Sequence, residues 1–338
     1  LAQLGNHSDP ATGAISPPIH LSSTFAHPGL GQSTGYDYSR TCNPTRDILE
    51  EGLATLEGGS AAVATSSGMS AIQLVFQLFD VGSHFLVSRD LYGGSFRYFN
   101  ELEAKGIASF SYFATEEEFT QQLNQQTTAV FVESPTNPLM QEIDLVSVSK
   151  QAKAVGARLI VDNTFLTPLR QRPLELGADI VVHSGTKYLT GVVVTIDSQI
   201  GEKLKWLANT TGPTLSAFDC WLFIRSLKTL PLRLDKQEKN AKGIVSALKT
   251  FSQVKEVLYP GKGAMISVRL HDAEQVPSIL AGVKLFTFAE SLGGVESLIT
   301  YPTSQTHADV PKELRESYGL TPDLVRLSVG IEDENDLS

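Results

Sequence analysis

The chain alternates short apolar runs with longer amphipathic stretches from about residue 45 to about residue 230. The apolar runs are rich in β-branched residues and almost uninterrupted by polar ones, which is typical of strands covered on both faces. They are "SHFLVS" (83–88), "TAVFVES" (128–134), "ARLIVDN" (157–163) and "ADIVVHS" (178–184). Apolar residues at helical spacing predict helices over 69–79, 116–126 and 145–156. Strands that alternate with helices predict an α/β fold with a mostly parallel sheet.

The pattern changes after Pro231. A long polar helix is expected over 232–251, followed by shorter strands around 264–270 and 283–290. The chain has 338 residues, and a single core rarely grows beyond roughly 250–300 residues. We therefore expect a large sheet domain over 45–230 and a smaller α/β domain over 231–338, with a separate N-terminal segment over 1–44.

Charge and cysteine content exclude several classes of protein. Lys and Arg number 27 against 37 Asp and Glu, for a net charge of −10, so no basic footprint for nucleic acid is visible. No stretch approaches the ~18 apolar residues of a membrane span, and the first residues do not resemble a secretory leader. Cys42 and Cys220 lack metal-ligand spacing and fit free thiols in a reducing compartment. These features favour a cytoplasmic protein without a metal, a membrane or a nucleic-acid partner.

Polar residues follow the apolar runs at the places where strands would end. They are Glu133, Asn137, Asp162, Asn163, Thr164, His183, Ser184, Thr186 and Lys187. Because ligands lie beyond the carboxyl ends of parallel strands, these residues predict one site. A helix start at "SSGMSA" (66–71) would add free backbone N–H groups for an anion. The glycine-rich fingerprints of nucleotide-binding loops are absent.

Each of these features has an ordinary interpretation when it is taken alone. Lys187 could be a solvated loop lysine, Asp162 a helix cap or turn residue, and "SSGM" a simple N-cap. Together they favour pyridoxal phosphate as the cofactor. That cofactor needs a lysine amine for its Schiff base, an acidic partner for its pyridine nitrogen, and a cradle for its phosphate.

Eight segments carry a resemblance to a known family. They are "YDYSRTCNPTR" (36–46), "SSGMSA" (66–71), "DLYGGSFR" (90–97), "ESPTNP" (133–138), "VDNTFLTP" (161–168), "HSGTKYL" (183–189), "FAESLGGVESLIT" (288–300) and "VRLSVGIED" (325–333). In this order they resemble the Cys/Met-metabolism family of pyridoxal-phosphate enzymes, from about residue 10 to the last residue. The resemblance implies the fold type I of pyridoxal-phosphate-dependent transferases, which is aspartate-aminotransferase-like, with a large domain and a smaller C-terminal domain.

The resemblance implies roles for the residues around the cofactor ring. Lys187 matches the Schiff-base lysine, which also moves protons on the substrate. Asp162 matches the partner of the pyridine nitrogen, with Thr164 beside the cofactor. Tyr92 matches the tyrosine that stacks on the ring and acts at the leaving group.

It also implies how the phosphate, the substrate and the neighbouring subunit are contacted. The expected phosphate ligands are the amides of Gly68 and Met69 and the hydroxyls of Ser184 and Thr186. Arg326 would bind the substrate α-carboxylate, with Ser291 and Asn137 beside it. Tyr38 and Arg40 match residues that reach the phosphate of a neighbouring subunit. That match makes residues 1–44 an arm and implies a homotetramer built as a dimer of dimers.

The subfamily resemblance points to bacterial cystathionine γ-synthase and O-acetylhomoserine thiolyase enzymes, as in "LYPGKGAMIS" (258–267) and "ITYPTSQTHADVP" (299–311). The implied reaction is γ-replacement on an O-acylated homoserine with cysteine or sulfide, giving cystathionine or homocysteine. Cleavage of cystathionine by a γ-lyase uses the same residues and remains the alternative, and a catalytically silent relative acting as a binding module remains a remote one. Gly94 stands where methionine γ-lyases typically carry cysteine, which disfavours that activity.

A few features depart from the family pattern or carry ordinary interpretations. The "KYLTG" segment runs almost directly into "VVVTID", so we expect about half a dozen residues to be missing after Leu189, and others at both termini. Glu133 is interpreted as ordering a neighbouring loop, His183 as a packing residue, and Cys42 as a small buried thiol.

Overall fold

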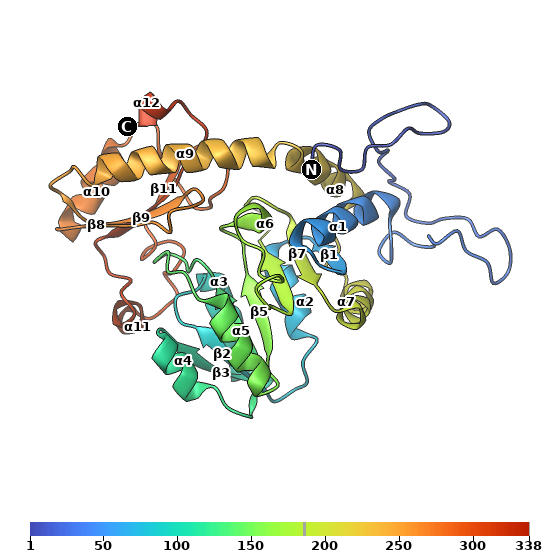
Figure 1. Cartoon of the computed structure of the whole chain (residues 1–338), viewed down its shortest axis with the longest axis horizontal. Coiled ribbons are helices and arrows are strands. Elements are labelled where there is room, and N and C mark those ends of the chain that lie inside the picture. Colours follow the sequence, from blue (N-terminus) through green and yellow to red (C-terminus); the bar gives the residue numbers. More distant parts are fainter. Residues whose placement is uncertain (185–186, 338) are drawn as a thin grey trace. The chain divides into compact units, whose positions relative to one another are not determined.

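The computed structural model describes residues 1–184 and 187–337, and Thr186 lies outside the described residues. The described chain forms two compact units that are both discontinuous in sequence. Unit 1 contains 1–80, 172–175 and 179–231, and unit 2 contains 81–171, 176–178 and 232–338. Figure 1 marks the two ends of the chain and colours it along the sequence, from blue at the N-terminus to red at the C-terminus. The division into an arm and two domains at residues 44 and 230 stays a prediction.

Unit 1 is built on strands that pair in the order β1-β7-β6. The strands are β1 (Ala61–Thr65), β6 (Ile180–His183) and β7 (Gly191–Thr195). The helices are α1 (Pro44–Glu57), α2 (Gly68–Phe76), α7 (Ser198–Thr211) and α8 (Ala217–Leu227). Strand β7 runs antiparallel to both neighbours. Residues 184–190 between β6 and β7 are too few for the crossover that a parallel pair requires.

Unit 2 contains a parallel sheet with the order β5-β4-β2-β3. Its strands are β2 (Ser83–Ser88), β3 (Ala108–Phe113), β4 (Thr127–Glu133) and β5 (Arg158–Asp162). Its helices are α3 (Gly93–Ala104), α4 (Glu116–Gln122), α5 (Leu145–Ala154) and α6 (Thr167–Arg170). Strands β2, β4, β5 and β6 confirm the four strands expected between residues 83 and 184, and β3 is a further strand that the apolar pattern did not predict. Phe99 packs on Phe110 and Phe131 under the sheet, with ring centroids 4.8 and 5.4 Å away.

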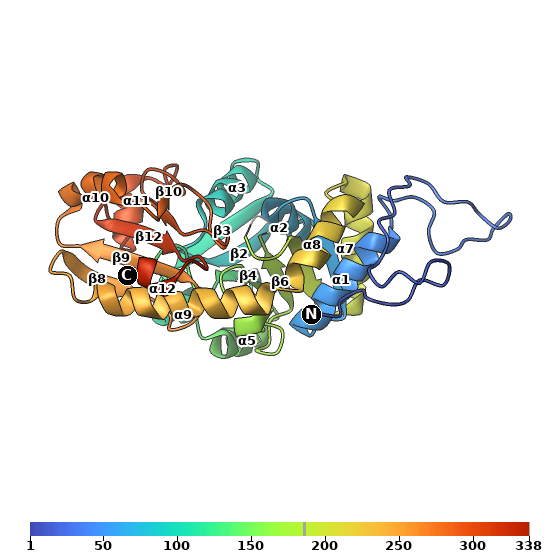
Figure 2. The ribbon, with the colours of Figure 1, turned by 90° about the horizontal axis from the view of Figure 1, so that it is seen from above.

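A second sheet of unit 2 has the order β10-β11-β12-β9-β8. Its strands are β8 (Val254–Leu258), β9 (Met265–Leu270), β10 (Thr287–Phe288), β11 (Leu298–Thr300) and β12 (Leu324–Ser328). The helices are α9 (Leu230–Leu248), α10 (Val276–Gly282), α11 (Lys312–Ser317) and α12 (Glu334–Leu337), with a 3₁₀ turn η1 (Ala273–Gln275). Figure 2 shows the later turns of α9 running beside β8 and β9.

The strand expected over 264–270 is confirmed as β9, whereas the one expected over 283–290 is mostly wrong. Only Thr287 and Phe288 pair, and both are exposed. Strand β10 is an edge strand whose sole neighbour, β11, has three residues. Because β11 has only three residues, it is too short to form a full strand ladder with the apolar residues of 283–290.

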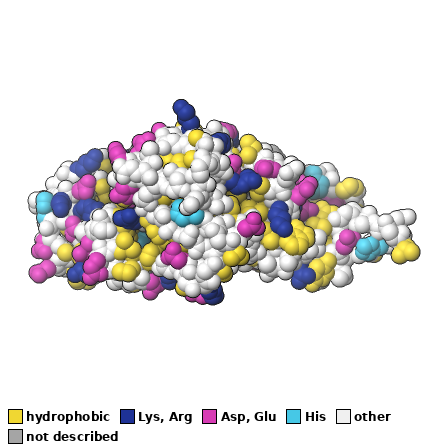
Figure 3. Space-filling view, turned by 90° about the horizontal axis from the view of Figure 1, so that it is seen from below, with side chains coloured by type: hydrophobic (Ala, Val, Ile, Leu, Met, Phe, Trp, Pro, Cys, Tyr) yellow, Lys and Arg dark blue, Asp and Glu magenta, His cyan; other side chains and the backbone are white. Residues whose placement is uncertain are grey.

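The surface carries charges of both signs. On the face drawn in Figure 3, Lys and Arg side chains are interspersed with Asp and Glu side chains. Within the described part of the chain, no helix combines the length and the apolar character needed to cross a membrane.

Candidate active site

The neighbouring ends of β4 and β5 bring two buried carboxyl groups together in unit 2. Glu133 and Asp162 occupy paired positions in the register, and they are 4% and 7% exposed. Asp162 accepts hydrogen bonds from the amide (3.0 Å) and the hydroxyl (2.5 Å) of Thr164. The expectation that polar residues converge at the strand ends holds for this pair. Thr164 thereby holds the carboxyl group of Asp162 in a fixed orientation.

Glu133 also orders the turn that carries Tyr92. One of its carboxyl oxygens accepts the backbone N–H of Tyr92 at 2.8 Å. Burial raises the pKa of Glu133 well above its ordinary value, and the nearby Asp162 raises it further. Both effects disfavour a second buried negative charge beside Asp162.

Tyr92 begins helix α3 and is 37% exposed. The next two residues are glycines because neighbouring groups fill the space of their side chains. A Cβ at Gly94 would lie 2.4 Å from Cε1 of the Tyr92 ring, and one at Gly93 would lie 2.1 Å from the carbonyl oxygen of Thr306. A larger residue at position 94 would displace the Tyr92 ring.

Arg326 on β12 is a fully buried cation with neutral partners. Its Nη1 donates to Asn137 Oδ1 at 2.8 Å, and its Nη2 donates to the carbonyl oxygen of Ser291 at 3.1 Å and to Thr300 Oγ1 at 3.4 Å. Burial lowers the pKa of Arg326 to about 10, so the side chain is charged at neutral pH. Among the described residues no carboxylate lies within ion-pair distance of it, and its Nε has no hydrogen-bond partner. The structure thus brings Arg326, Asn137 and Ser291 together, as predicted, around a cation able to receive a carboxylate.

In unit 1 the start of α2 lies against the end of β6. A Cβ on Gly68 would fall 2.5 Å from the Cα of Ser184, so no larger residue fits there. Ser67 caps the helix by accepting the Ser70 N–H at its side chain, and its carbonyl accepts the Ala71 N–H. The amides of Gly68 and Met69 at this helix start are therefore directed away from the helix interior, where an anion can bind.

Lys187 follows on the same segment, where its backbone N–H donates to the carbonyl of Ser184 at 3.3 Å. The predicted phosphate ligands Gly68, Met69 and Ser184 thus lie together with the segment that carries Lys187. Thr186, also predicted there, lies outside the described residues. His183, the preceding residue, is buried with its Nε2 2.5 Å from Glu57 Oε1, which agrees with its interpretation as a packing residue.

Tyr38 and Arg40 lie on the N-terminal arm. The Arg40 guanidinium stands 5.3 Å from the centre of the Tyr38 ring, and its Nε donates to Asn209 on α7 at 3.3 Å. Tyr38 is 43% exposed. Their role toward a neighbouring subunit stays a prediction.

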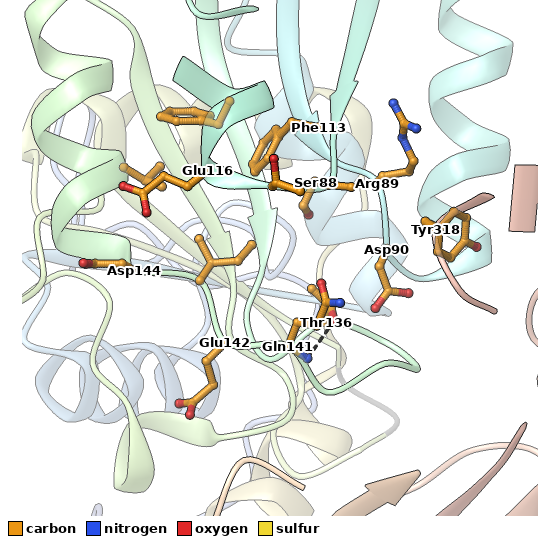
Figure 4. A pocket seen from close by; sticks show the side chains of 15 residues that line it. Ser88, Arg89, Asp90, Phe113, Glu116, Thr136, Gln141, Glu142, Asp144 and Tyr318 are labelled. Carbon is orange, nitrogen blue, oxygen red and sulfur yellow. Dashed lines mark hydrogen bonds between the residues drawn. The ribbon is translucent and has the colours of Figure 1, made fainter. Parts of the chain in front are cut away.

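Sequence reasoning missed a cavity and a buried carboxyl group in unit 2. A cavity of about 260 Å³ opens at the ends of β2 and β3, and the predicted site residues are not among the described residues that line it (Figure 4). Asp90, labelled there, is buried, and its Oδ2 accepts the N–H of Leu139 at 3.1 Å. Burial raises the pKa of Asp90 to about 7. The strand-end rule could have found Asp90, which follows β2 by two residues.

These groups fit pyridoxal phosphate. Taken by itself, unit 1 holds a lysine next to a helix start that Gly68 keeps open for an anion. Taken by itself, unit 2 holds a buried carboxyl group that accepts two hydrogen bonds from Thr164. The family described as Cys/Met metabolism PLP-dependent enzyme, where PLP is pyridoxal phosphate, matches residues 1–338. The chain belongs to this family. It is accordingly a PLP-dependent enzyme, and its cofactor is pyridoxal phosphate.

Alignments with relatives from this family span nearly the whole chain. A cystathionine gamma-synthase/O-acetylhomoserine (thiol)-lyase of Bacillus subtilis is 49% identical, with 100% of this chain and 93% of the relative covered. A cystathionine gamma-lyase of the same organism is 45% identical, with 98% and 94% covered. The solved cystathionine gamma synthase from Xanthomonas oryzae pv. oryzae, in complex with aminoacrylate and cysteine, is 42% identical with a TM-score of 0.96, covering 99% of this chain and 94% of that one. The likeness confirms the predicted fold type I.

Proposed function

We propose that the enzyme catalyses γ-replacement on an O-acylated homoserine, with cysteine or sulfide as the incoming thiol. The observation that carries the proposal is the 49% identity, over the whole chain, to a relative whose name includes both of these activities. The buried Arg326 supports an α-amino acid as the substrate, because its hydrogen-bond partners are neutral oxygens and a carboxylate beside it would offset the desolvation of its charge.

Each unit by itself offers groups for the cofactor. Lys187 would hold the cofactor covalently, and Gly68, Met69 and Ser184, with Thr186, would bind its phosphate through amides and hydroxyls. Asp162 would accept the pyridine N–H, with Thr164 holding the carboxylate in place. When bound, the cofactor supplies an electron sink that acidifies the protons on the substrate Cα.

The remaining steps belong to the side chains of the protein. The Arg326 guanidinium would fix the substrate carboxylate through two parallel hydrogen bonds, with Asn137 holding the guanidinium plane. The Lys187 amine would remove and return protons at Cα and Cβ. The Tyr92 hydroxyl, exposed at the start of α3, would donate a hydrogen bond to the departing acyloxy oxygen at Cγ.

We further propose that the enzyme is a homotetramer in which Tyr38 and Arg40 of one protomer reach the phosphate of the next. The exposed position of both side chains on an irregular arm supports this assignment. Co-expression of an Arg40→Ala chain with a Lys187→Ala chain tests it. Hybrid dimers would contain one site with both residues intact and would regain part of the activity that each variant alone lacks. An inactive hybrid would contradict the shared site.

The second candidate is cystathionine γ-cleavage, which the 45% identity to a cystathionine gamma-lyase favours. Both reactions need the same carboxylate-binding arginine, lysine base and ring-stacking tyrosine. The choice depends on whether a thiol or a water molecule completes the reaction.

Product analysis of the holoenzyme separates the two reactions. We would incubate it with O-acetyl- or O-succinylhomoserine plus cysteine or sulfide, and in parallel with cystathionine alone. The proposal predicts cystathionine or homocysteine with a kcat/KM at least about tenfold above that for cystathionine cleavage, a preference of ~1.4 kcal/mol in transition-state binding. Faster release of cysteine and 2-oxobutanoate from cystathionine would instead establish the lyase. Absence of every product, in a protein that binds the cofactor, would favour the silent relative.

A further inference from the structure

His307 is a completely buried histidine that joins two loops of unit 2. Its Nε2 lies 3.1 Å from the carbonyl oxygen of Leu91 and 3.0 Å from that of Asn137, and its Nδ1 lies 2.8 Å from Thr306 Oγ1. Carbonyl oxygens only accept, so Nε2 carries the hydrogen and shares it between them. Nδ1 then accepts the Thr306 hydroxyl hydrogen. The ring is a neutral donor with one defined tautomer.

The segment around His307 is seated firmly against the turn that carries Tyr92. Gly93 leaves room for the carbonyl of Thr306, which would lie 2.1 Å from a Cβ at that position. An ion pair of 2.5 Å joins Arg97 on α3 to Asp309. The segment around His307 therefore contacts α3 at Gly93 and at Arg97. From this segment the Nε2–H of His307 donates to the carbonyl of Leu91, the residue before Tyr92.

The other carbonyl that His307 binds belongs to Asn137, whose side chain contacts Arg326. The same turn is held by Ser267, whose hydroxyl donates to the carbonyl of Pro138 at 2.6 Å, and by Asp90, which accepts the Leu139 N–H. Figure 4 labels Asp90 and, below it, Thr136, the residue before Asn137. One imidazole N–H therefore links the Tyr92 turn to the support of the buried arginine.

We propose that His307 is a positioning residue that fixes the Tyr92 turn and the Asn137–Arg326 pair relative to each other. A substrate whose carboxylate is bound by Arg326 would then have its leaving group next to Tyr92. The inference rests on the proposed roles of Tyr92 and Arg326. Burial and the nearby Arg326 charge together lower the pKa of His307 to about 4, so the ring keeps its neutral form at the pH of catalysis. A proton carrier would need a pKa nearer the working pH.

Two substitutions separate the hydrogen-bond donor from the bulk of the ring. In His307→Gln the side-chain amide nitrogen can occupy the place of Nε2 and has two hydrogens for the two carbonyls. His307→Leu keeps an apolar side chain of moderate size and leaves both carbonyls unsatisfied. His84→Leu is the matched control, because His84 is a partly buried histidine on β2 whose side chain has, among the described residues, one hydrogen-bond partner, the Ser111 hydroxyl.

The test measures amino-acid binding by the holoenzyme, followed through the absorbance of the bound cofactor. L-alanine and n-propylamine are the probes, since only the first has a carboxylate for Arg326. We expect His307→Leu to weaken L-alanine about tenfold or more, the size of leaving a buried acceptor unsatisfied, and to change n-propylamine by less than about twofold. His307→Gln should restore L-alanine binding to within about threefold of the wild type, and His84→Leu should alter neither probe.

Several results would overturn the proposal. They are unchanged L-alanine binding by His307→Leu, equal weakening of both probes, no rescue by His307→Gln, or the loss of one limb of the pH profile of kcat/KM in His307→Gln. If His307→Leu does not fold, His307→Asn replaces it, because the shorter amide cannot span both carbonyls.

Failure of the proposed function gives a different signature. If product analysis identifies a lyase, the two probes still measure how strongly Arg326 binds a carboxylate. The same results then support or overturn the inference. If the wild-type enzyme binds L-alanine no better than n-propylamine, Arg326 does not bind a carboxylate, and the proposed substrate site itself is wrong.

Discussion

The two units provide anion-binding regions of opposite character. In unit 1 the start of α2 offers neutral amides beside Ser184, at a spacing that only glycine at position 68 permits. In unit 2 a full positive charge on Arg326 lies 1% exposed among neutral oxygens. One region binds through dipoles and the other through a buried ion.

The difference teaches which region suits which ligand. A helix start remains stable when empty because its amides can bind water, so it can hold a permanent phosphate group at little cost to folding. A buried guanidinium without a carboxylate carries a desolvation penalty that an arriving carboxylate offsets. We therefore propose that the cofactor phosphate is bound in unit 1 and that the substrate carboxylate is recognised in unit 2.

The largest expected effect is on Lys187. In Lys187→Ala, turnover should fall on the order of 10³-fold or more, because proton transfer at the substrate loses its base. Cofactor retention should fall much less, since the helix start is intact. Equilibrium dialysis and steady-state kinetics check the two parts. Turnover above about one tenth of the wild type would mean that another base acts.

A charge-preserving change in unit 2 tests the claim about shape and burial. Arg326→Lys should lower kcat/KM about 100-fold, mainly through KM, because an ammonium cannot make two parallel hydrogen bonds to a carboxylate. Arg269→Lys is the matched control, since Arg269 lies on the adjacent strand β9 and binds Glu256 and the carbonyl of Gly319 instead. The comparison fails if both variants raise KM equally or if Arg326→Lys loses the cofactor.

Buried charge in unit 2 should also give a pH-dependent stability. The pKa of Asp90 is raised by burial from 3.8 to about 7, so the folded state holds a proton that the unfolded state releases. This contribution to stability is present below about pH 4 and is lost as the pH rises to about 7. Asp90→Asn removes the titration, so its stability relative to the wild type should rise by about 2 kcal/mol from about pH 5 to about pH 8.

Urea unfolding of the holoenzymes at both pH values measures this difference. A constant gap between Asp90→Asn and the wild type would show that Asp90 does not titrate in this range.

The smallest expected effect lies in unit 1. Gly68→Ala places a Cβ 2.5 Å from the Ser184 backbone, which should weaken cofactor affinity about tenfold, in the range of a local strain of ~1–2 kcal/mol. Added pyridoxal phosphate should restore turnover. The control is Gly282→Ala at the end of α10, where an added Cβ meets nothing within 4 Å. Unchanged cofactor affinity in Gly68→Ala would remove the argument for a close-fitting cradle.

Sequence patterns predicted the parts of this account that depend on local order. Apolar runs located β2, β4, β5 and β6, and the strand-end rule led to Glu133, Asp162 and Lys187. The family resemblance supplied Tyr92 and Arg326, for which periodicity gave no signal. The apolar pattern over 283–290 predicted a longer strand than the structure has, because this edge segment has only the short strand β11 to pair with.

The sequence could not predict contacts made across long loops. His307 stands in an irregular segment and meets Leu91 and Asn137, which precede it by 216 and 170 residues. No local sequence pattern around this histidine indicates that its ring binds two carbonyl groups on distant loops. The burial of Asp90 could not be predicted either, because it depends on the turn at Leu139 that folds over it.

The central claim is that Lys187 and the helix start beside it hold the cofactor. The most direct measurement is to record the visible spectrum of the purified holoenzyme, reduce it with borohydride, and map the labelled peptide by mass spectrometry. The account predicts a yellow protein whose label resides on Lys187. A label on any other lysine, or a protein that stays colourless with added pyridoxal phosphate, would contradict it.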